Sequence, residues 1–510
     1  MTDYREHGRR IAKNTLMLYV RMLFMMFLGL FTSRIVLEAL GENDYGIYNV
    51  VGGVVVMFAV ISGALNSAIS RFITYEIGKG AGNERLNAVY STAVIIQALI
   101  SLIIVLMAEP VGLWFIENEM TIDPVRIPAA KYVLQFTLLS FVINLMSVPQ
   151  MALITAHEQM SVYAGVGILD GLLRFGTALL IRSCASDRLV IYAALMSASV
   201  LVVRLAYLVY CRVSFPHGRF RPLLDRPLLK EMFSFAGWGF IGTMSGVLRD
   251  QGGNLLVNVF SGPGVNAARA VAFQLNGAVQ NFVINFMTAV NPQITKSYAS
   301  GEHDYMFSLL RKAARMSFYL LFILALPILF NTDRILELWL KDVPEYTAVF
   351  VRLFIILALC ESVSYPLVTA MLATGRIRNY QIVVGGLQML NLPVSYALLK
   401  IGYPPEVTVV VAICISQVSL VARLLMLRSM IGLSVRDFLL RVCFNVLVVA
   451  AAGTVAASLV TGLVSNAIVS SLLCIVLAGL SCLFAGCSSK ERKEIVVFIL
   501  NRIRRDSNIG

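Results

Sequence analysis

Long apolar segments separated by short polar gaps repeat along almost the whole chain. A membrane-spanning helix needs about 20 consecutive, mostly apolar residues. Segments of that kind begin near Asn14, Tyr48, Val89, Tyr132, Tyr163, Leu189, Met232, Asn266, Met316, Thr347, Gln381, Val407, Phe438 and Asn466. This pattern predicts an all-α polytopic membrane protein with about 14 transmembrane helices.

The composition agrees with this prediction and excludes an ordinary soluble domain. Charged residues make up 14% of the chain and hydrophobic residues 58%, whereas soluble domains carry roughly 25% charged residues. The net charge of +13 does not indicate nucleic acid, because the Lys and Arg residues are spread over short loops rather than gathered on one face. Alternate connections, including both ends, hold most of these cations, which predicts that both termini are cytoplasmic.

Two stretches of the chain resemble one another at matching distances. Asn66-Ser-Ala-Ile-Ser-Arg71 resembles Asn291-Pro-Gln-Ile-Thr-Lys296, at an offset of 291 − 66 = 225. The segment that begins at Pro149 resembles the one that begins at Pro366, at 366 − 149 = 217. Transporters are often built from such repeated halves. We therefore predict an N-terminal lobe of six helices over 1–215, a cytoplasmic linker over 216–229, a C-terminal lobe of six helices over 230–430, two extra helices over 431–487 and a basic cytoplasmic tail over 488–510.

Several ionisable residues fall inside the predicted spans, where each costs about 2.5 to 3.5 kcal/mol unless it faces water or a partner. Asp170 and Arg174 lie one helical turn apart, so we expect them to neutralise each other. Arg204 and Arg423 occupy equivalent positions near helix ends, where we expect them to reach the headgroups. The remaining candidates are Arg21, Arg34, Arg71, Arg249, Asp250, Arg269, Arg352 and Glu361.

Spans 7 and 8 each carry a stripe of polar residues along one face. Such stripes are explained either by hydrogen bonds between helices or by a hydrated cavity, in which amides bind sugar hydroxyls and arginines bind a diphosphate. The candidate substrate-binding residues are Arg21, Arg71, Arg249, Asp250, Asn254, Asn258, Arg269, Asn276 and Gln280. The cysteines show no metal-binding spacing, and the sequence predicts no catalytic residue, metal or cofactor.

Four motifs resemble a known family: Leu40-Gly-Glu-Asn-Asp-Tyr-Gly-Ile-Tyr48, Ser261-Gly-Pro-Gly-Val-Asn-Ala-Ala-Arg269, Asn291-Pro-Gln-Ile-Thr-Lys-Ser-Tyr298 and Ala373-Thr-Gly-Arg-Ile-Arg-Asn-Tyr380. With them the chain resembles the multidrug/oligosaccharidyl-lipid/polysaccharide (MOP) exporter superfamily, and within it the polysaccharide repeat-unit flippases (Wzx type) of lipopolysaccharide biosynthesis. The resemblance implies a MATE-like pair of six-helix lobes that rock around a central cavity in the bacterial inner membrane.

The same resemblance implies the substrate and the partners. The substrate would be an undecaprenyl-diphosphate-linked oligosaccharide, an O-antigen or capsule repeat unit, carried from the cytoplasmic to the periplasmic face. Implied partners are membrane lipid, H+ or Na+ as coupling ion and a polysaccharide polymerase, but no nucleic acid. Two alternatives stay open: a cation-coupled multidrug exporter of the MATE type, and a membrane glycosyltransferase or ligase. An exporter of cations needs an acidic cavity, and an enzyme needs catalytic carboxylates or His on long loops.

The distribution of charge predicts the topology of the loops. Reporter fusions after Asp123 and Asp342 should give a periplasmic signal, and fusions after Gly80 and Gly301 should give a cytoplasmic one. Alkaline phosphatase and green fluorescent protein fusions of equal expression measure the two cases. A cytoplasmic signal at Asp123 would contradict the assignment of spans 3 and 4.

Overall fold

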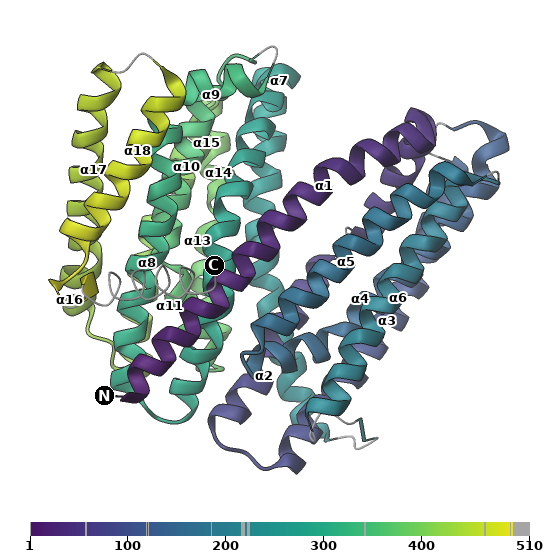
Figure 1. Cartoon of the computed structure of the whole chain (residues 1–510), viewed down its shortest axis with the longest axis horizontal. Coiled ribbons are helices and arrows are strands. Elements are labelled where there is room, and N and C mark those ends of the chain that lie inside the picture. The colour runs from purple at the N-terminus through teal and green to yellow at the C-terminus, as the bar shows by residue number, and fades with distance from the viewer. Residues whose placement is uncertain are drawn as a thin grey trace, which may run out of the picture. The chain divides into compact units, whose positions relative to one another are not determined.

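The computed structural model describes residues 2–56, 59–118, 120, 122–184, 186–215, 220–221, 225–340, 343–463, 466–489 and 491–492. Every regular element in these ranges is a helix (Figure 1), which confirms the predicted all-α fold. Ten of the described helices are long and apolar enough to cross a membrane, or eleven if one bent pair counts as a single span. The predicted number of 14 stays a prediction. Part of the predicted linker and most of the predicted tail lie outside the described residues.

The chain divides into two compact units. The first unit comprises Met1–Met244 and Thr288–Glu302, and the second comprises Ser245–Met287 and His303–Gly510. The chain passes between the units twice within the long helical element α7, after Met244 and after Met287, and once more between Glu302 and His303. This division does not test the predicted boundaries of the lobes, the linker and the extra helices, which stay predictions.

The helices have the following bounds. Those up to α7 are α1 (Thr2–Val56), α2 (Ala59–Gly78), α3 (Asn83–Asn118), α4 (Ile127–Ala156), α5 (Met160–Leu180), α6 (Arg188–Ser214) and α7 (Arg226–Ala299), with the short 3₁₀ turns η1 (Pro124–Arg126) and η2 (Ile181–Ser183). Those after α7 are α8 (His303–Phe330), α9 (Thr332–Trp339), α10 (Thr347–Ser362), α11 (Tyr365–Ala373), α12 (Arg378–Tyr380), α13 (Gly386–Met389), α14 (Asn391–Ile401), α15 (Val407–Ile431), α16 (Val435–Phe438), α17 (Phe444–Leu463) and α18 (Ala467–Ser481). The π-helical segments η3 (Gln381–Gly385), η4 (Leu439–Cys443) and η5 (Cys482–Gly486) adjoin them.

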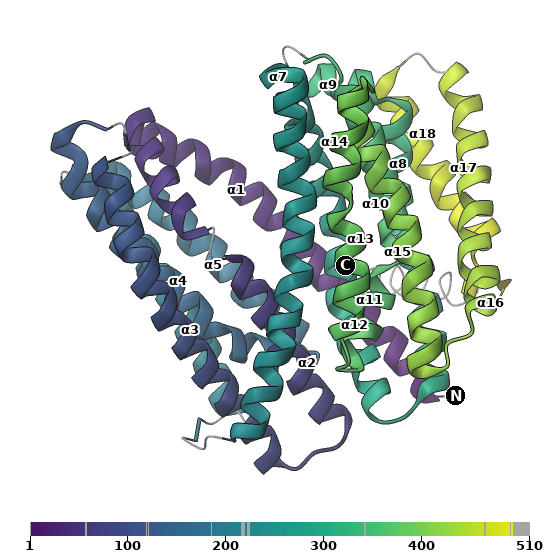
Figure 2. The ribbon, with the colours of Figure 1, turned by 180° about the vertical axis from the view of Figure 1, so that it is seen from behind.

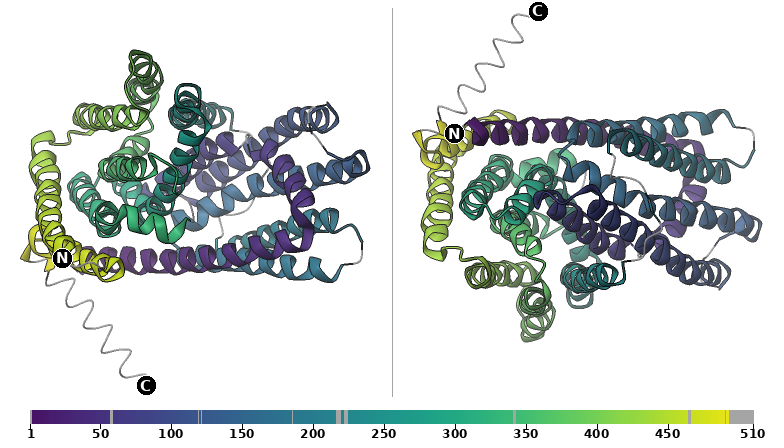
Figure 3. Two further views of the ribbon diagram at one scale, coloured as in Figure 1. Left: turned by 90° about the horizontal axis from the view of Figure 1, so that it is seen from above. Right: turned by 90° about the horizontal axis from the view of Figure 1, so that it is seen from below.

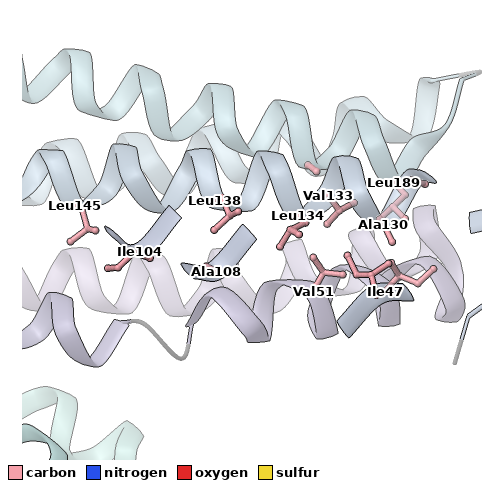
Figure 4. Close-up of a cluster of buried hydrophobic side chains, with 13 residues drawn as sticks. Ile47, Val51, Ile104, Ala108, Ala130, Val133, Leu134, Leu138, Leu145 and Leu189 are labelled. Atoms are coloured by element: carbon pink, nitrogen blue, oxygen red, sulfur yellow. The ribbon is translucent and has the colours of Figure 1, made fainter. Parts of the chain in front are cut away.

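The core of the first unit lies where α4 packs against α3 and α6. Ile104, Leu134, Leu138 and Leu189 belong to one cluster of buried apolar side chains (Figure 4). Gly112 allows the close approach of α3 to α4, because a Cβ there would come within 2.8 Å of both methyl groups of Leu134. Lipid is as apolar as these side chains, so this core stabilises the unit through close contact rather than through removal from water.

In the second unit α17 and α18 pack against α8 (Figures 1 and 2). The Tyr319 hydroxyl donates a hydrogen bond to Asn445, and the Asn445 amide donates to the carbonyl of Gly486 at 3.0 Å. Arg315 donates to the same carbonyl at 3.3 Å and forms an ion pair with Glu491 at 2.5 Å. Polar contacts, which are stronger where water is scarce, therefore attach the last helices to α8.

The two longest elements, α1 and α7, each contain one sharp kink. Gly41 has φ 77° and ψ 169°, and Gly262 has φ 83° and ψ 175°. Both conformations are readily available only to glycine. Figure 3 shows the purple ribbon of α1 changing direction. Both glycines lie in the motifs after spans 1 and 7, at an offset of 262 − 41 = 221. The two elements therefore have the same kinked backbone conformation at equivalent positions.

The turns that follow these elements repeat as well. Gly80 and Gly301 have φ values of 68° and 79°. In the first turn the backbone N–H of Ala81 donates to the carbonyl of Glu76, and in the second Glu302 donates to Ser297, both at 3.0 Å. This six-to-one bond satisfies the otherwise unpaired carbonyls at a helix end. The offset is again 301 − 80 = 221, which supports an internal repeat.

A third pair of turns has the same backbone but different chemistry. Gly375 follows α11 with φ 75°, and Glu158 follows α4 with φ 60°, at an offset of 375 − 158 = 217. A left-handed conformation costs a residue with a Cβ about 1 to 3 kcal/mol and persists only where its surroundings hold it. Glu158 is one of two non-glycine residues with positive φ in the described part of the chain.

Polar contacts from α1 and α7 hold Glu158 in place. Its carboxylate forms ion pairs with Lys296 at 2.7 Å and Arg10 at 3.2 Å, and it accepts a hydrogen bond from Gln293 at 2.8 Å. The Asn14 amide donates to its backbone carbonyl at 3.3 Å. Only 3% of the Glu158 side chain is exposed. One buried carboxylate therefore ties the α4–α5 turn to the start of α1 and the end of α7.

We expect Glu158→Gln to lower the melting temperature of the purified protein and to weaken its dependence on acid pH. Burial alone would raise the pKa of Glu158, but Lys296 and Arg10 outweigh burial and hold the pKa below the usual value. The stabilisation from the carboxylate is thus present above the unfolded pKa of about 4.3 and is lost as pH falls through the lower folded pKa.

Thermal unfolding in detergent between pH 7 and pH 3 measures this effect. Breaking a buried ion pair costs about 3 to 5 kcal/mol, which should appear as a drop of several degrees at pH 7. Glu345→Gln is the matched control, because Glu345 is exposed and forms no ion pair in the described structure. Equal acid sensitivity of wild type and Glu158→Gln would contradict the assignment.

Candidate functional site

Most of the predicted site residues lie on α7, on either side of its kink at Gly262. The kink folds the helix back, so that Arg269 reaches Asn254 and Asp250, which precede it by 15 and 19 residues. Residues 245–287 all belong to the second unit. Arg249, Asp250, Asn254 and Arg269 thus form a single network, whose members we call the α7 network.

Two carboxylates hold the guanidinium of Arg249. Its Nε donates to Asp250 at 2.9 Å, and its Nη1 donates to Glu361 of α10 at 2.6 Å. The side chains of Arg249, Asp250 and Glu361 are 16%, 29% and 20% exposed. The sequence analysis places Glu361 inside a predicted span but does not predict it as a substrate-binding residue. Nothing in the sequence pairs it with Arg249, since the two are 112 positions apart.

Arg269 is buried without a carboxylate of its own. Its Nη1 donates to the Asn254 side chain and, at 3.3 Å, to the backbone carbonyl of Asp250. The guanidinium carbon lies 5.3 Å from the centre of the Phe354 ring. The residue is 4% exposed, its Nε has no hydrogen-bond partner, and it forms no ion pair among the described residues.

The close packing around Arg269 depends on Gly253. A Cβ at that position would come within 2.5 Å of Nη2 of Arg269. Any larger residue would therefore push the guanidinium out of its place. The Gly-Gly pair at 252–253 is accordingly a sequence signal of the site, because glycine within a helix often marks a close approach.

Three predicted amides, Asn258, Asn276 and Gln280, form no hydrogen bond with the α7 network in the described structure. Asn276 is buried at 5% exposure, and its Oδ1 has no hydrogen-bond partner. Asn258 is exposed and Gln280 is half-buried, and neither contributes a contact to the α7 network in the described structure. The Asn254 amide donates to Gln251 at 3.2 Å, so the predicted polar stripe is partly satisfied within one helix.

The other two predicted arginines lie in the first unit, each against aromatic rings. The Arg21 guanidinium lies 4.5 Å from the centre of the Tyr163 ring. Arg71 is 9% exposed, and its guanidinium lies 4.7 Å from the ring centre of Phe72 and 4.5 Å from that of Tyr75. Cation–π contacts of this kind stabilise a desolvated guanidinium by about 2 kcal/mol.

Two other intramembrane predictions have clear outcomes. Arg174 donates to Asp170 at 2.9 Å, which confirms the predicted pair. Arg204 donates to the carbonyl of Ile143 at 3.3 Å. The expectation that Arg204 reaches the headgroups stays a prediction. The expectation that Arg423 reaches the headgroups is wrong, because this residue is buried at 6% exposure and its Nε has no hydrogen-bond partner.

The α7 network with Glu361 combines two cations and two anions and is neutral overall. Arg249 is fully engaged by carboxylates, whereas the Nε of Arg269 is unused. An anion with several oxygens could therefore bind Arg269 by charge-assisted hydrogen bonds. Among the described residues no three His, Cys, Asp or Glu side chains gather as a metal site would require.

Comparisons with known proteins agree with this architecture. Residues 11–298 match the family described as "Polysaccharide biosynthesis protein". The chain is also similar to the uncharacterized membrane protein EpsK of Bacillus subtilis (strain 168), with 22% identity over 335 residues. That similarity covers 65% of this chain, and the chain spans 65% of the length of EpsK.

Solved transporters have the same fold. A MATE transporter in the bent conformation matches with a TM-score of 0.72 and 12% identity, over 83% of this chain and 96% of that one. A MOP superfamily transporter from Pyrococcus furiosus, described as having a binding pocket of reverse polarity, matches at 0.69 and 11%, over 82% and 95%. The MATE transporter ClbM in complex with Rb+ matches at 0.61 and 15%, over 83% and 96%.

These similarities confirm the expected MATE-like architecture and the resemblance drawn from the motifs. The matched segment, 11–298, makes up more than half of the 510 residues. The many apolar helices agree with a protein that crosses the membrane several times. The chain therefore belongs to the polysaccharide biosynthesis protein family, and its many apolar helices make it a multi-pass membrane protein.

Proposed function

We propose that this protein is a flippase that carries an undecaprenyl-diphosphate-linked oligosaccharide from the cytoplasmic to the periplasmic face by alternating access. The observation that supports this proposal most is Arg269, a guanidinium buried at membrane depth with no carboxylate partner in the described structure. Such a cation needs an anion or water nearby. The diphosphate of a lipid-linked saccharide is an anion that must cross the same apolar layer.

The chemistry of the two partners is complementary. Moving an isolated anion out of water costs many kcal/mol unless a cation accompanies it. A guanidinium presents its donors in a planar fork that matches phosphate oxygens. The Nε of Arg269 is unpaired, and its Nη1 is held by Asn254 and a backbone carbonyl, which fixes the direction of the fork.

Arg249 would take part by exchanging partners. In the empty site Asp250 and Glu361 share its charge. When a diphosphate enters beside Arg269, its oxygens compete with these carboxylates for the guanidinium of Arg249. Release of the substrate would return Arg249 to the carboxylates, so the site resets between cycles. We propose Arg21 and Arg71 as further contacts to the carrier, and Asn254, Asn258, Asn276 and Gln280 as contacts to the saccharide.

The distribution of loop charge supports the rest of the proposal. Both termini would lie on the cytoplasmic side of the bacterial inner membrane. The substrate would be a repeat unit of an O-antigen or capsule, handed to a polysaccharide polymerase, with H+ or Na+ as the coupling ion. The family name, which refers to polysaccharide biosynthesis, favours this class of substrate.

The rival function is a cation-coupled multidrug exporter. Two observations favour it: the carboxylates of Asp250 and Glu361, which could hold a cation, and the similarity to MATE structures. Against it, both carboxylates are already bonded to Arg249. A cationic drug would have to displace an internal guanidinium, which makes this function the weaker candidate.

We expect Arg269→Ala to abolish surface polysaccharide in a deletion strain, because the loss of a charge-assisted contact weakens anion binding by about tenfold or more. Arg269→Lys should retain partial display, since the charge stays and the fork is lost. Arg436→Ala is the control, because Arg436 is exposed and unpaired in the described structure. Wild-type display by Arg269→Ala at matched protein level would eliminate this residue, and drug resistance conferred by the wild type would favour the exporter.

A second prediction concerns the partners of Arg249. Arg249→Ala should lower the melting temperature and the amount of protein in the membrane, because it leaves two half-buried carboxylates unpaired. Adding Asp250→Asn and Glu361→Gln should restore the amount of protein but not transport. Membrane abundance and surface polysaccharide, measured on the same cells, separate the two effects. Restored transport in the triple variant would show that Arg249 has a structural role only.

A further inference from the structure

A cleft of the first unit lies between α2 and α4, apart from the α7 network. It has a volume of about 280 Å³. Gly63 and Asn66 line it from α2, and Phe141, Asn144 and Val148 line it from α4. None of the described residues that line it is charged. The cleft is thus an apolar and aromatic surface with two amide side chains.

The two amides lie at the same depth in the unit. Asn66 precedes the last residue of α2 by 78 − 66 = 12 positions, and Asn144 precedes the last residue of α4 by 156 − 144 = 12. At 1.5 Å per residue each lies about 18 Å from its helix end. That distance places both amides in the middle of the predicted spans, where an unpaired polar group facing lipid costs several kcal/mol.

Neither amide has a hydrogen-bond partner among the residues that the structure describes, although both could form such bonds. Asn49 and Asn118 donate to the carbonyls four residues before them in their own helices, at 2.8 Å and 2.9 Å. Asn66 and Asn144 make no such bond in the described structure and keep their donors and acceptors open to the cleft. Groups of this kind at membrane depth must be met by water or by a ligand.

A third amide lies at the same level on α3. Tyr90 hydrogen-bonds Gln150 at 2.9 Å, and Gly112 packs against Leu134, so α3 and α4 run antiparallel with these pairs side by side. Counting residues along the two helices between these pairs places Gln97 of α3 at the same depth as Asn144 of α4. Gln97 is fully buried, and within the described part of the chain neither polar atom of its amide has a hydrogen-bond partner. Unsatisfied amides therefore gather around one depth of this unit.

The lining selects one class of ligand. A cationic drug would find no carboxylate here, and an isoprenoid chain would leave the amides unsatisfied. A sugar ring suits both features, because its hydroxyls bond to amides while its C–H face packs against the Phe141 ring. The volume lies near the lower end of small-ligand pockets, roughly 300 to 1,000 Å³, which suits one ring rather than a whole oligosaccharide.

We propose that Asn66 and Asn144 form a saccharide subsite that binds one pyranose ring of the cargo, an inference that rests on the proposed flippase function. The subsite binds the sugar, whereas the proposed arginines bind the diphosphate carrier. The first unit then adds a sugar contact to the amides already proposed, and the contribution of the lipid carrier stays the same for every cargo.

The test uses two probes on the purified full-length protein in nanodiscs. One probe is undecaprenyl diphosphate, and the other is the undecaprenyl-diphosphate-linked oligosaccharide isolated from a strain that lacks this protein. The variant is Asn66→Leu combined with Asn144→Leu, which removes the amides while keeping apolar bulk. Asn49→Leu is the matched control, because its amide already bonds within its own helix.

The inference requires that the double variant bind the linked oligosaccharide at least about tenfold more weakly than wild type and bind undecaprenyl diphosphate unchanged. Equal binding of both probes by wild type and double variant would overturn the subsite and leave the flippase proposal standing. Loss of both probes by a variant that still elutes as a folded protein would also overturn it, because the effect must be specific to sugar. Failure of the wild-type protein to bind either probe would refute the flippase function itself.

Discussion

The reversal of α7 at Gly262 is the constraint on which the site of the second unit depends. In an uninterrupted helix, the 19 residues between Asp250 and Arg269 would span about 28 Å; the kink instead brings Arg269 within 3.3 Å of the Asp250 carbonyl. Glycine makes the turn possible because it adopts φ 83° without a steric penalty. Once the helix is folded back, the Arg269 guanidinium donates to Asn254 and to the Asp250 carbonyl, while Arg249 is paired with carboxylates.

The first unit uses the same backbone with different chemistry. Gly41 reproduces the conformation of Gly262, yet the two predicted site arginines of the first unit, Arg21 and Arg71, lie against aromatic rings. Glu158 likewise stands in a left-handed turn where the other half has Gly375, and its ion pairs offset the strain. The repeated backbone therefore fixes the positions of the turns, while the side chains at those positions make different contacts in the two halves.

The sequence predicts the all-α architecture because hydropathy records the solvent of each segment directly. It also predicts contacts set by a single helix, as the Asp170–Arg174 pair shows at 2.9 Å. The sequence does not predict contacts between segments that are far apart along the chain. Glu361 meets Arg249 across 112 positions, and Arg423, which looks like a headgroup contact by position, is buried by helices that the hydropathy pattern does not orient. Whether an asparagine bonds to its own helix, as Asn49 does, or stays open, as Asn66 does, depends on a rotamer that no residue pattern encodes.

The charge balance of the α7 network with Glu361 bears on how the proposed transport would be driven. Arg249 is paired with two carboxylates at once, so a diphosphate that draws its guanidinium away leaves Asp250 and Glu361 both half-buried and unpaired. Two such anions are costly in a medium of low dielectric constant. The cost falls if a proton or a cation enters as the substrate binds and leaves when Arg249 returns. On the proposed function, coupling to an ion thus follows from one arginine shared between two acids and an anionic cargo, without a separate ion site elsewhere in the chain.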